Sequence, residues 1–322
     1  MPCHVDAVVI GRNEGDNLHR CLAALRGQVR RVIYVDSGST DGSQQMAVDM
    51  GAELVELDRD TPFTAARARN AGLAALAQDP PDFVQFLDGD CEMDGAWIAT
   101  ALAAFASHPA AVVVCGRRRE RFPQASRYNK VTDREWDSPI GKAKACGGDA
   151  LMRYGAVQAV GGYRANLIAG EEPELCLRLA RQGGEIWRID AEMTMHDAKI
   201  HRFSQWWRRM VRSGYAYAAG AALYGRAPER HWLKERNRAV LWALVLPVLA
   251  LLAGLIHPLG FALALIYPVQ IIRLAARGGF TAEAWNWATL SLLTRFAEAR
   301  GILSYWLDQR RGRFRGLIEY RS

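Results

Sequence analysis

The sequence predicts an α/β fold with a mainly parallel sheet, followed by helices that associate with a membrane. Short apolar runs alternate with amphipathic stretches through the first half of the chain, which indicates right-handed β-α-β crossovers. Acidic residues stand where several of these runs end. Two long uncharged runs follow in the last third of the chain. We therefore expect a domain at 1–230 and a helical region with a basic tail at 231–322.

The expected elements follow from hydrophobic periodicity and turn residues. A first helix should begin at Asp16 as its N-cap, because Leu18, Cys21, Leu22 and Leu25 share one helical face. Strands are expected at 7–10, 31–36, 53–56, 83–88, 111–115 and 185–190, and further helices from about 43 to 50, at 64–77 and at 96–106.

Composition narrows the class of protein. Half of the 322 residues are apolar, which excludes a disordered chain. The six cysteines form no Cys-x-x-Cys pair, which argues against a zinc cluster or a disulfide framework and fits a reducing compartment. The net charge of +7 predicts an anionic partner: a nucleotide, a nucleic acid or a lipid surface.

The run at 83–87 ends in Asp88, Gly89 and Asp90. Open α/β sheets hold ligands at the carboxyl ends of their strands, so both acids are candidate binding residues. They repel each other unless a cation joins them, and Mg²⁺ or Mn²⁺ takes carboxylate oxygens and commonly shares them with a diphosphate. A solvated Asp-Gly-Asp turn is the alternative.

The turns after the strands argue against a dinucleotide dehydrogenase and against a P-loop NTPase. The chain lacks Gly-x-Gly-x-x-Gly after the first strand, and it lacks a P-loop. Glu14 and Asp36 instead stand at strand ends, where a carboxylate accepts from a base N–H or a ribose hydroxyl. Arg69 adds a cationic contact. Capping of the next helix is an equal alternative for Asp36.

From about Arg117 to Asp149 the regular pattern breaks down. Arginines cluster there and glycines mark loops, so we interpret the segment as an acceptor-side loop or a solvated connection.

Glu171 and Glu172 precede Pro173, which suits the first position of a helix. A carboxylate at a helix N-terminus is held in a defined direction, as a general base requires. Helix capping is the alternative, although glutamate caps poorly.

Five motifs then stand in the order typical of one family: 8–14 (VVIGRNE), 36–42 (DSGSTDG), 68–72 (ARNAG), 87–90 (LDGD) and 170–175 (GEEPEL). The chain resembles family 2 glycosyltransferases of the GT-A fold, a Rossmann-like nucleotide-sugar-binding fold, from about residue 5 to 215. The resemblance implies inverting transfer of a sugar from a UDP- or GDP-sugar.

By that resemblance, Asp36 and Arg69 hold the base, Asp88 contacts the ribose and Asp90 binds the metal. Gly11, Asn13 and Glu14 of the first motif are assigned to the same nucleotide sugar. The assigned cofactor is Mg²⁺ or Mn²⁺.

The resemblance also implies the base and a further metal ligand. The family usually has Glu-Asp where this chain has Glu171 and Glu172, and the second position is the base. Glu172 is therefore the expected base, with Glu171 as the alternative. His196 is the expected further metal ligand, with a structural histidine as the alternative.

The segment 204–209 (SQWWRR) is similar to the Gln-x-x-Arg-Trp signature of processive members, but its order differs. Arg208 or Arg209 is expected to neutralise the leaving diphosphate, with Arg208 as the assigned residue, and a tryptophan there to stack on an acceptor sugar. An interfacial membrane helix is the alternative.

The uncharged runs are 239–256 and 259–272, interrupted by Pro247 and Pro268. Basic residues flank the pair and none lies in its turn, so both ends are expected in the cytoplasm. Three arrangements fit these runs: two membrane spans, a re-entrant hairpin, or a hairpin in the core of a soluble protein. The helix at 285–306 should lie in the interface, and the basic tail at 310–315 should contact anionic lipid rather than nucleic acid.

These patterns together predict a bacterial-type enzyme at the inner face of the cytoplasmic membrane. Its acceptor would be lipid-linked or a glycan. The alternatives are a processive polysaccharide synthase and a non-catalytic scaffold that binds sugar nucleotides.

Overall fold

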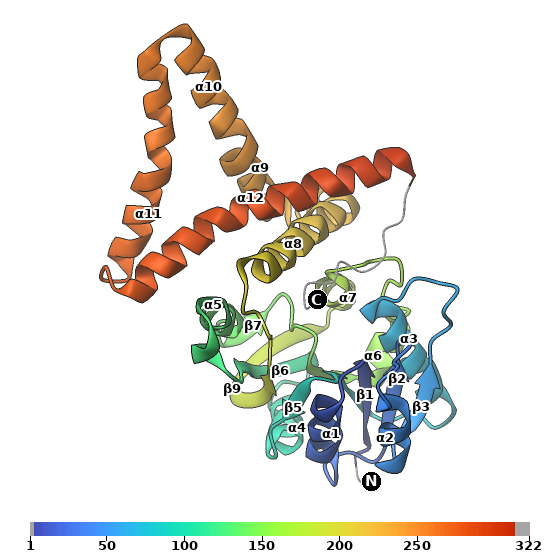
Figure 1. Ribbon diagram of the computed structural model, residues 1–322. Coiled ribbons are helices and arrows are strands. Elements are labelled where there is room, and N and C mark those ends of the chain that lie inside the picture. The colour runs from blue at the N-terminus through green and yellow to red at the C-terminus, as the bar shows by residue number, and fades with distance from the viewer. Residues whose placement is uncertain (1–2, 313–322) are drawn as a thin grey trace. The chain divides into compact units, whose positions relative to one another are not determined.

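The computed structural model describes residues 3–312 (Figure 1). The chain forms two compact units, which divide between Lys199 and Ile200. The sequence prediction placed this border at residue 230, so the helix that follows Arg202 belongs to the second unit rather than to the first.

The strands of the first unit form one mixed sheet over the described residues. They are β1 (Val5–Gly11), β2 (Val32–Asp36), β3 (Glu53–Glu56), β4 (Phe83–Asp88), β5 (Cys91–Met93), β6 (Ala111–Glu120), β7 (Gly141–Ala143), β8 (Ala150–Arg153) and β9 (Glu185–His196). Their order is β3-β2-β1-β4-β8-β6-β9-β5, and β7 pairs with β9. The predicted parallel sheet is confirmed from β3 to β4, whereas β8 runs antiparallel to both β4 and β6.

Strand register brings three of the predicted residues to one edge of this sheet. Gly11 at the end of β1 lies opposite Asp36 at the end of β2. On the other side of β1, Ile10 lies opposite Asp88 at the end of β4. Because these strands are parallel, their carboxyl ends form the ligand edge that the fold class predicts.

Helices of the first unit connect the strands. They are α1 (Asp16–Leu25), α2 (Ser43–Asp49), α3 (Ala65–Ala75), α4 (Trp97–Ser107), α5 (Arg127–Trp136), α6 (Tyr154–Ala159) and α7 (Glu171–Arg181), with short 3₁₀ turns at Leu76–Gln78 and Pro123–Ala125. The predicted N-cap role of Asp16 is wrong, because Gly15 caps α1 and Asp16 is the first helical residue. An acid in the first turn still interacts favourably with the helix dipole.

The core of the first unit lies between its sheet and these helices. Val8, Phe86 and Leu151 of the central strands are fully buried, and they pack with buried residues of α1, α3 and α7. A Cβ added to Gly72 of α3 would overlap the Val8 side chain, so glycine there allows α3 to lie close against β1. This packing sets the position of Arg69, which lies one turn earlier in α3.

The segment from Arg117 to Asp149 is partly regular, contrary to the sequence prediction, although 137–140 and 144–149 are loops as predicted. β6 continues through Arg117 to Glu120, and α5 and β7 follow it. Arg117 is buried, and Asp133 and Asp137 pair with its guanidinium at 3.1 and 3.4 Å. A buried arginine in a strand needs such partners, and the local sequence does not reveal them.

The second unit is helical. Its elements are α8 (Phe203–Tyr224), α9 (Leu233–Val240), a π turn (Leu241–Val245), α10 (Leu246–Ile256), a 3₁₀ segment (Pro258–Leu265), α11 (Ile266–Arg277) and α12 (Ala282–Arg311). α8 and α12 pack directly on each other, since a Cβ on Gly214 would overlap the Glu298 carbonyl and one on Gly301 would overlap that of Val211.

Two helices of this unit are long and apolar enough to cross a membrane. They are Leu233–Ile256 and Pro258–Arg277, the two arms that meet at the turn in Figure 1. Their side chains are mostly exposed, and Ile256 and Leu259 at the turn are 87% and 75% exposed. The Tyr267 hydroxyl donates to the Trp242 carbonyl at 2.6 Å, which joins the arms.

The last described helix of this unit is α12. The predicted interfacial helix at 285–306 lies within α12. The predicted basic tail extends beyond Gly312 and so falls partly outside the described residues.

Candidate active site

Asn13 joins the first two loops at the carboxyl edge of the sheet. Its backbone N–H donates to Ser39 Oγ at 2.9 Å, and its Oδ1 accepts from the Thr40 N–H at 2.8 Å. Asn13 is left-handed, with φ 55°, a conformation that asparagine tolerates better than most residues. The loops after β1 and β2 therefore form one surface.

Glu14 lies over the ends of β1 and β4. A Cβ on Gly11 would be 3.2 Å from Glu14 Cγ, and one on Gly89 would be 3.5 Å from the same atom. Both glycines thus leave room for the Glu14 side chain beside the ligand edge.

Asp36 is fully buried and organises the turn that follows β2. Its carboxylate accepts from the N–H groups of Gly38 and Ser39, both at 2.8 Å, from Gln44 Nε2 at 2.9 Å and from the Tyr34 hydroxyl at 3.1 Å. The Ser39 hydroxyl donates to it as well, so five donors already surround Asp36, and a donor group of a nucleotide would have to replace one of them.

Arg69 connects the ligand edge to the start of α7. Its Nη2 lies 2.9 Å from Asp88 Oδ1, and its Nη1 lies 2.8 Å from Glu171 Oε1. The Arg69 side chain is 3% exposed, whereas that of Asp88 is 31% exposed. Asp88 therefore has an oxygen that a ligand can reach, and Arg69 holds its orientation from within.

Gly148 makes this arrangement possible. A Cβ there would lie 2.9 Å from Arg69 Nη2, 3.1 Å from Asp88 Oδ2 and 3.3 Å from Arg118 Nη2. The sequence identified Gly148 only as a loop residue, since its three neighbours are distant along the chain.

Asp149 is a buried acid of the site that sequence reasoning missed. Its Oδ2 accepts from Thr194 Oγ1 at 2.8 Å and pairs with Arg118 Nη2 at 2.9 Å, while its Oδ1 accepts from the Asp88 N–H at 3.3 Å. Asp149 immediately precedes β8, which runs antiparallel to β4. The start of β8 therefore meets the end of β4, a placement that a parallel-sheet prediction does not suggest.

The two glutamates at the start of α7 have different environments. Glu171 is buried and paired with Arg69, whereas half-buried Glu172 accepts from the Gly147 N–H at 3.0 Å. Burial, followed by the charge of Glu171, raises the pKa of Glu172 to about 7, and Arg69 opposes the shift. Among the described residues, Glu171 forms an ion pair with Arg69 and Glu172 forms none. Glu172 is thus a carboxylate suited to exchange a proton near neutral pH.

The sequence predicted that Pro173 is the first residue of α7, but it is the third. The helix begins at Glu171, after left-handed Gly170 with φ 80°. The first-turn position is still compatible with proline, because N–H groups there have no partner within the helix.

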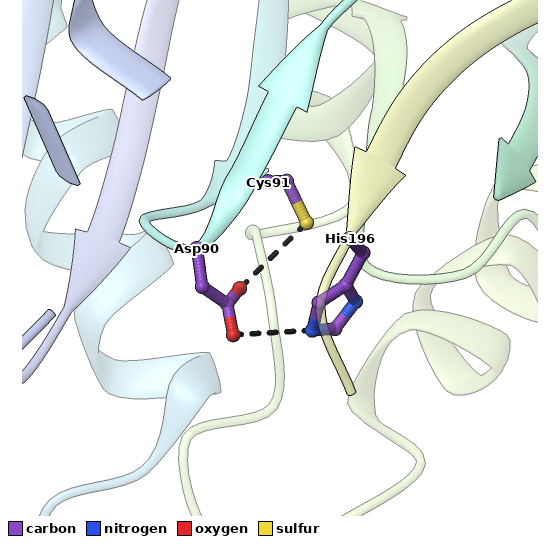
Figure 2. A group of neighbouring side chains, drawn as sticks. All are labelled: Asp90, Cys91 and His196. Carbon is purple, nitrogen blue, oxygen red and sulfur yellow. Dashed lines mark hydrogen bonds and ion pairs between the residues drawn. The ribbon is translucent and has the colours of Figure 1, made fainter. Parts of the chain in front are cut away.

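Figure 2 shows a second cluster, formed by Asp90, Cys91 and His196. β5 pairs with β9 so that Cys91 lies opposite His196. His196 Nε2 lies 3.1 Å from Asp90 Oδ2, and both side chains are buried. One ligand atom from each of the three residues lies within 4.8 Å of the other two. The chain turn at Gly89 thus brings Asp90 to the end of β9.

This donor set fits Mg²⁺ or Mn²⁺ through two of its members. A carboxylate and an imidazole suit Mn²⁺, and a carboxylate with open positions for water and phosphate oxygens suits Mg²⁺. Cys91 fits less well, because burial raises the pKa of its thiol well above its usual range and soft thiolates favour other metals. Asp90 and His196, which the sequence singled out as metal ligands, are therefore adjacent.

Arg208 lies on α8 in the second unit. It is consequently not among the side chains that the first unit brings together at this site.

Comparison with known proteins identifies a family to which the first unit is similar. Residues 6–155 match the model of the family described as "Glycosyl transferase family 2". This range is similar to family 2 glycosyltransferases. The matched range contains the strand-end residues from Gly11 to Asp90, and it ends before Glu172 and His196.

Relatives extend the similarity further along the chain. A pre-mycofactocin glycosyltransferase of Mycobacterium tuberculosis is 27% identical over 243 residues, which are 71% of this chain and 50% of the relative. The succinoglycan biosynthesis protein ExoA of Rhizobium meliloti is 26% identical over 247 residues, 70% of this chain and 68% of the relative. The chain therefore spans about half the length of the first relative.

A solved structure confirms the predicted GT-A fold. A mannosyltransferase from Pyrobaculum calidifontis, in complex with GDP-Man and Mn²⁺, superimposes with a TM-score of 0.63 at 17% sequence identity. The superposition covers 94% of this chain and 88% of that one.

Proposed function

We propose that this protein is an inverting glycosyltransferase that moves a sugar from a nucleotide-diphosphate sugar to an acceptor hydroxyl. The observation that carries the proposal is the path from Asp88 through Arg69 and Glu171 to Glu172. These contacts, together with a pKa of about 7 for Glu172, support a base at this position beside the ligand edge.

The donor would lie along the carboxyl edge of the sheet. Asp88 would accept from a ribose hydroxyl with its exposed oxygen, and Arg69 would hold Asp88 in place. Gly11, Asn13, Glu14 and Asp36 would shape the pocket for the base. The role of Arg208 at the leaving diphosphate stays a prediction from the sequence, because Arg208 belongs to the second unit.

Glu172 would remove the proton from the acceptor hydroxyl. The acceptor oxygen then bonds to the anomeric carbon while the bond from that carbon to the diphosphate oxygen breaks, and the proton remains on Glu172. Attack from the face opposite the leaving group inverts the anomeric configuration. A base with a pKa near the working pH combines a deprotonated ground state with a useful affinity for the proton.

Asp90 and His196 would hold Mg²⁺ or Mn²⁺. A bound cation neutralises charge on the diphosphate as it leaves. The similar mannosyltransferase was solved with GDP-Man and Mn²⁺, which supports both a metal and a nucleotide-sugar donor for this chain.

The second unit would place the enzyme at the inner face of the cytoplasmic membrane. Its two apolar helices support membrane insertion, either as two spans or as a re-entrant hairpin. Lys234, Arg236 and Arg238 precede the first uncharged run, 239–256, and Arg273 and Arg277 follow the second, 259–272, so the flanks favour a cytoplasmic catalytic domain and contact with anionic lipids. A lipid-linked or glycan acceptor fits that location.

Thermal stabilisation tests donor binding directly. The full-length protein in detergent would be mixed with a panel of UDP-, GDP- and dTDP-sugars with Mn²⁺, and one class should raise its melting temperature by mass action. No stabilisation by any of these donors would count against the proposal.

Release of nucleoside diphosphate separates the rivals. A single-transfer enzyme releases one equivalent for each acceptor hydroxyl, and a processive synthase continues to release it as its product lengthens. A scaffold binds donor and releases none, with or without acceptor. The altered order of residues at 204–209 favours single transfer.

A further inference from the structure

Trp136, the last residue of α5, stacks on the His196 ring. The two ring centroids are 4.9 Å apart and the planes differ by 13°. The Arg118 guanidinium carbon lies 5.4 Å from the centroid of the same indole, and Arg118 is itself paired with Asp149. The indole therefore contacts two side chains of the site, His196 and Arg118.

Buried Glu120 attaches α5 to the strand that carries His196. Its Oε1 accepts from Asn129 Nδ2 on α5 at 3.1 Å, and its Oε2 accepts from the Ala198 N–H at 2.8 Å. β6 also pairs Glu120 directly with His196 in register. Glu120 thus links α5, which carries Trp136, to the chain segment that carries His196.

We propose that Trp136 is a positioning residue, which holds the His196 imidazole so that Nε2 faces Asp90 and both present ligand atoms to one divalent cation. The inference rests on the proposed metal site at these two residues. The stack restricts rotation of the His196 ring about its Cβ–Cγ bond, because that rotation would drive the ring edge into the indole. A ligand held in its binding orientation loses less freedom when the metal binds.

Mn²⁺ binding without nucleotide tests the inference apart from activity. The electron paramagnetic resonance signal of free Mn²⁺ would be titrated against the full-length protein and against Trp136→Leu. Loss of a residue that orients a metal ligand typically weakens metal binding about 10–100-fold, and we expect a loss in that range. Trp136→Phe keeps an aromatic ring and should recover most of the affinity.

The chain offers a matched control. Trp187 also stacks on a histidine, His108, with centroids 3.8 Å apart and planes at 5°, and it lies on the same strand as His196. Trp187→Leu removes a stack of the same kind away from Asp90, so its Mn²⁺ affinity should stay at the wild-type value.

A second measurement avoids substitution altogether, in case Trp136→Leu does not fold. In tryptophan-labelled protein, bound Mn²⁺ should broaden the indole N–H resonance of Trp136 strongly and that of Trp187 less.

Unchanged Mn²⁺ affinity in Trp136→Leu would overturn the inference alone, as would an equal loss of affinity in Trp187→Leu. Equal broadening of both indole resonances would show that Mn²⁺ binds elsewhere, and it would overturn the metal site together with the inference. A wild-type protein that binds no Mn²⁺ would likewise overturn the metal site, and the inference with it.

Discussion

Replacing Glu172 by glutamine should separate donor binding from turnover. Glutamine keeps an oxygen that can accept from the Gly147 N–H at the 3.0 Å contact, but it cannot take a proton from an acceptor hydroxyl. Removing a positioned base typically lowers the rate about 10²–10⁴-fold. Donor affinity should stay close to the wild-type value, since Asp88 and Arg69 are unchanged.

The same substitution should change stability in a pH-dependent way. Burial and the Glu171 charge raise the pKa of Glu172 from 4.5 to about 7. A raised carboxyl pKa contributes stability that is complete below about pH 4.5 and is lost as the pH rises through about 7. The shift corresponds to at most about 3 kcal/mol at alkaline pH. Glu172→Gln should therefore gain stability relative to wild type at pH 8 and not at pH 4.5.

Two assays measure these effects: nucleoside diphosphate release under single-turnover conditions, and thermal unfolding at both pH values. The wild-type rate should rise with pH through about 7 as Glu172 loses its proton. Glu171→Gln is the control, since Glu171 is engaged by Arg69, and it should lose less activity. Full turnover in Glu172→Gln, with a dead Glu171→Gln, would transfer the base to Glu171, and full turnover in both would refute a base at this position.

Three further outcomes are expected. Asp90→Asn should abolish activity and cation-dependent donor binding with an unchanged circular dichroism spectrum, and full activity of chelator-treated protein would contradict the metal site. Gly148→Ala should weaken donor binding measurably, because its Cβ would displace Arg69 or Asp88, and titration calorimetry would detect the loss; unchanged affinity would show that the loop yields. The full-length protein should require detergent after lysis, whereas a chain that ends at Lys199, the border of the first unit, should not. If the shortened chain is found in the membrane pellet, the membrane anchor lies in the first unit.

Local patterns sufficed for the parallel half of the sheet. β1 to β4 are apolar runs that end in turn residues or acids, and their positions follow from periodicity. β5, β7 and β8 have only three or four residues each, too few to show a period. These three short strands and their antiparallel pairings were therefore not predicted, and with them the junction of β8 and β4 that places Asp149.

The candidate site shows the same division. Asp88, Asp90, Glu171 and Glu172 follow strand ends or begin a helix, so sequence spacing identified them. Trp136, by contrast, acquires its role by contact with His196, which is distant along the chain. Such contacts depend on tertiary packing, and no short motif encodes them.

The anomeric configuration of the transferred sugar tests the central claim most directly. Nuclear magnetic resonance of the purified product, compared with its donor, distinguishes inversion from retention. A single displacement with Glu172 as base predicts the configuration opposite to that of the donor. Retention of the donor configuration would contradict that mechanism.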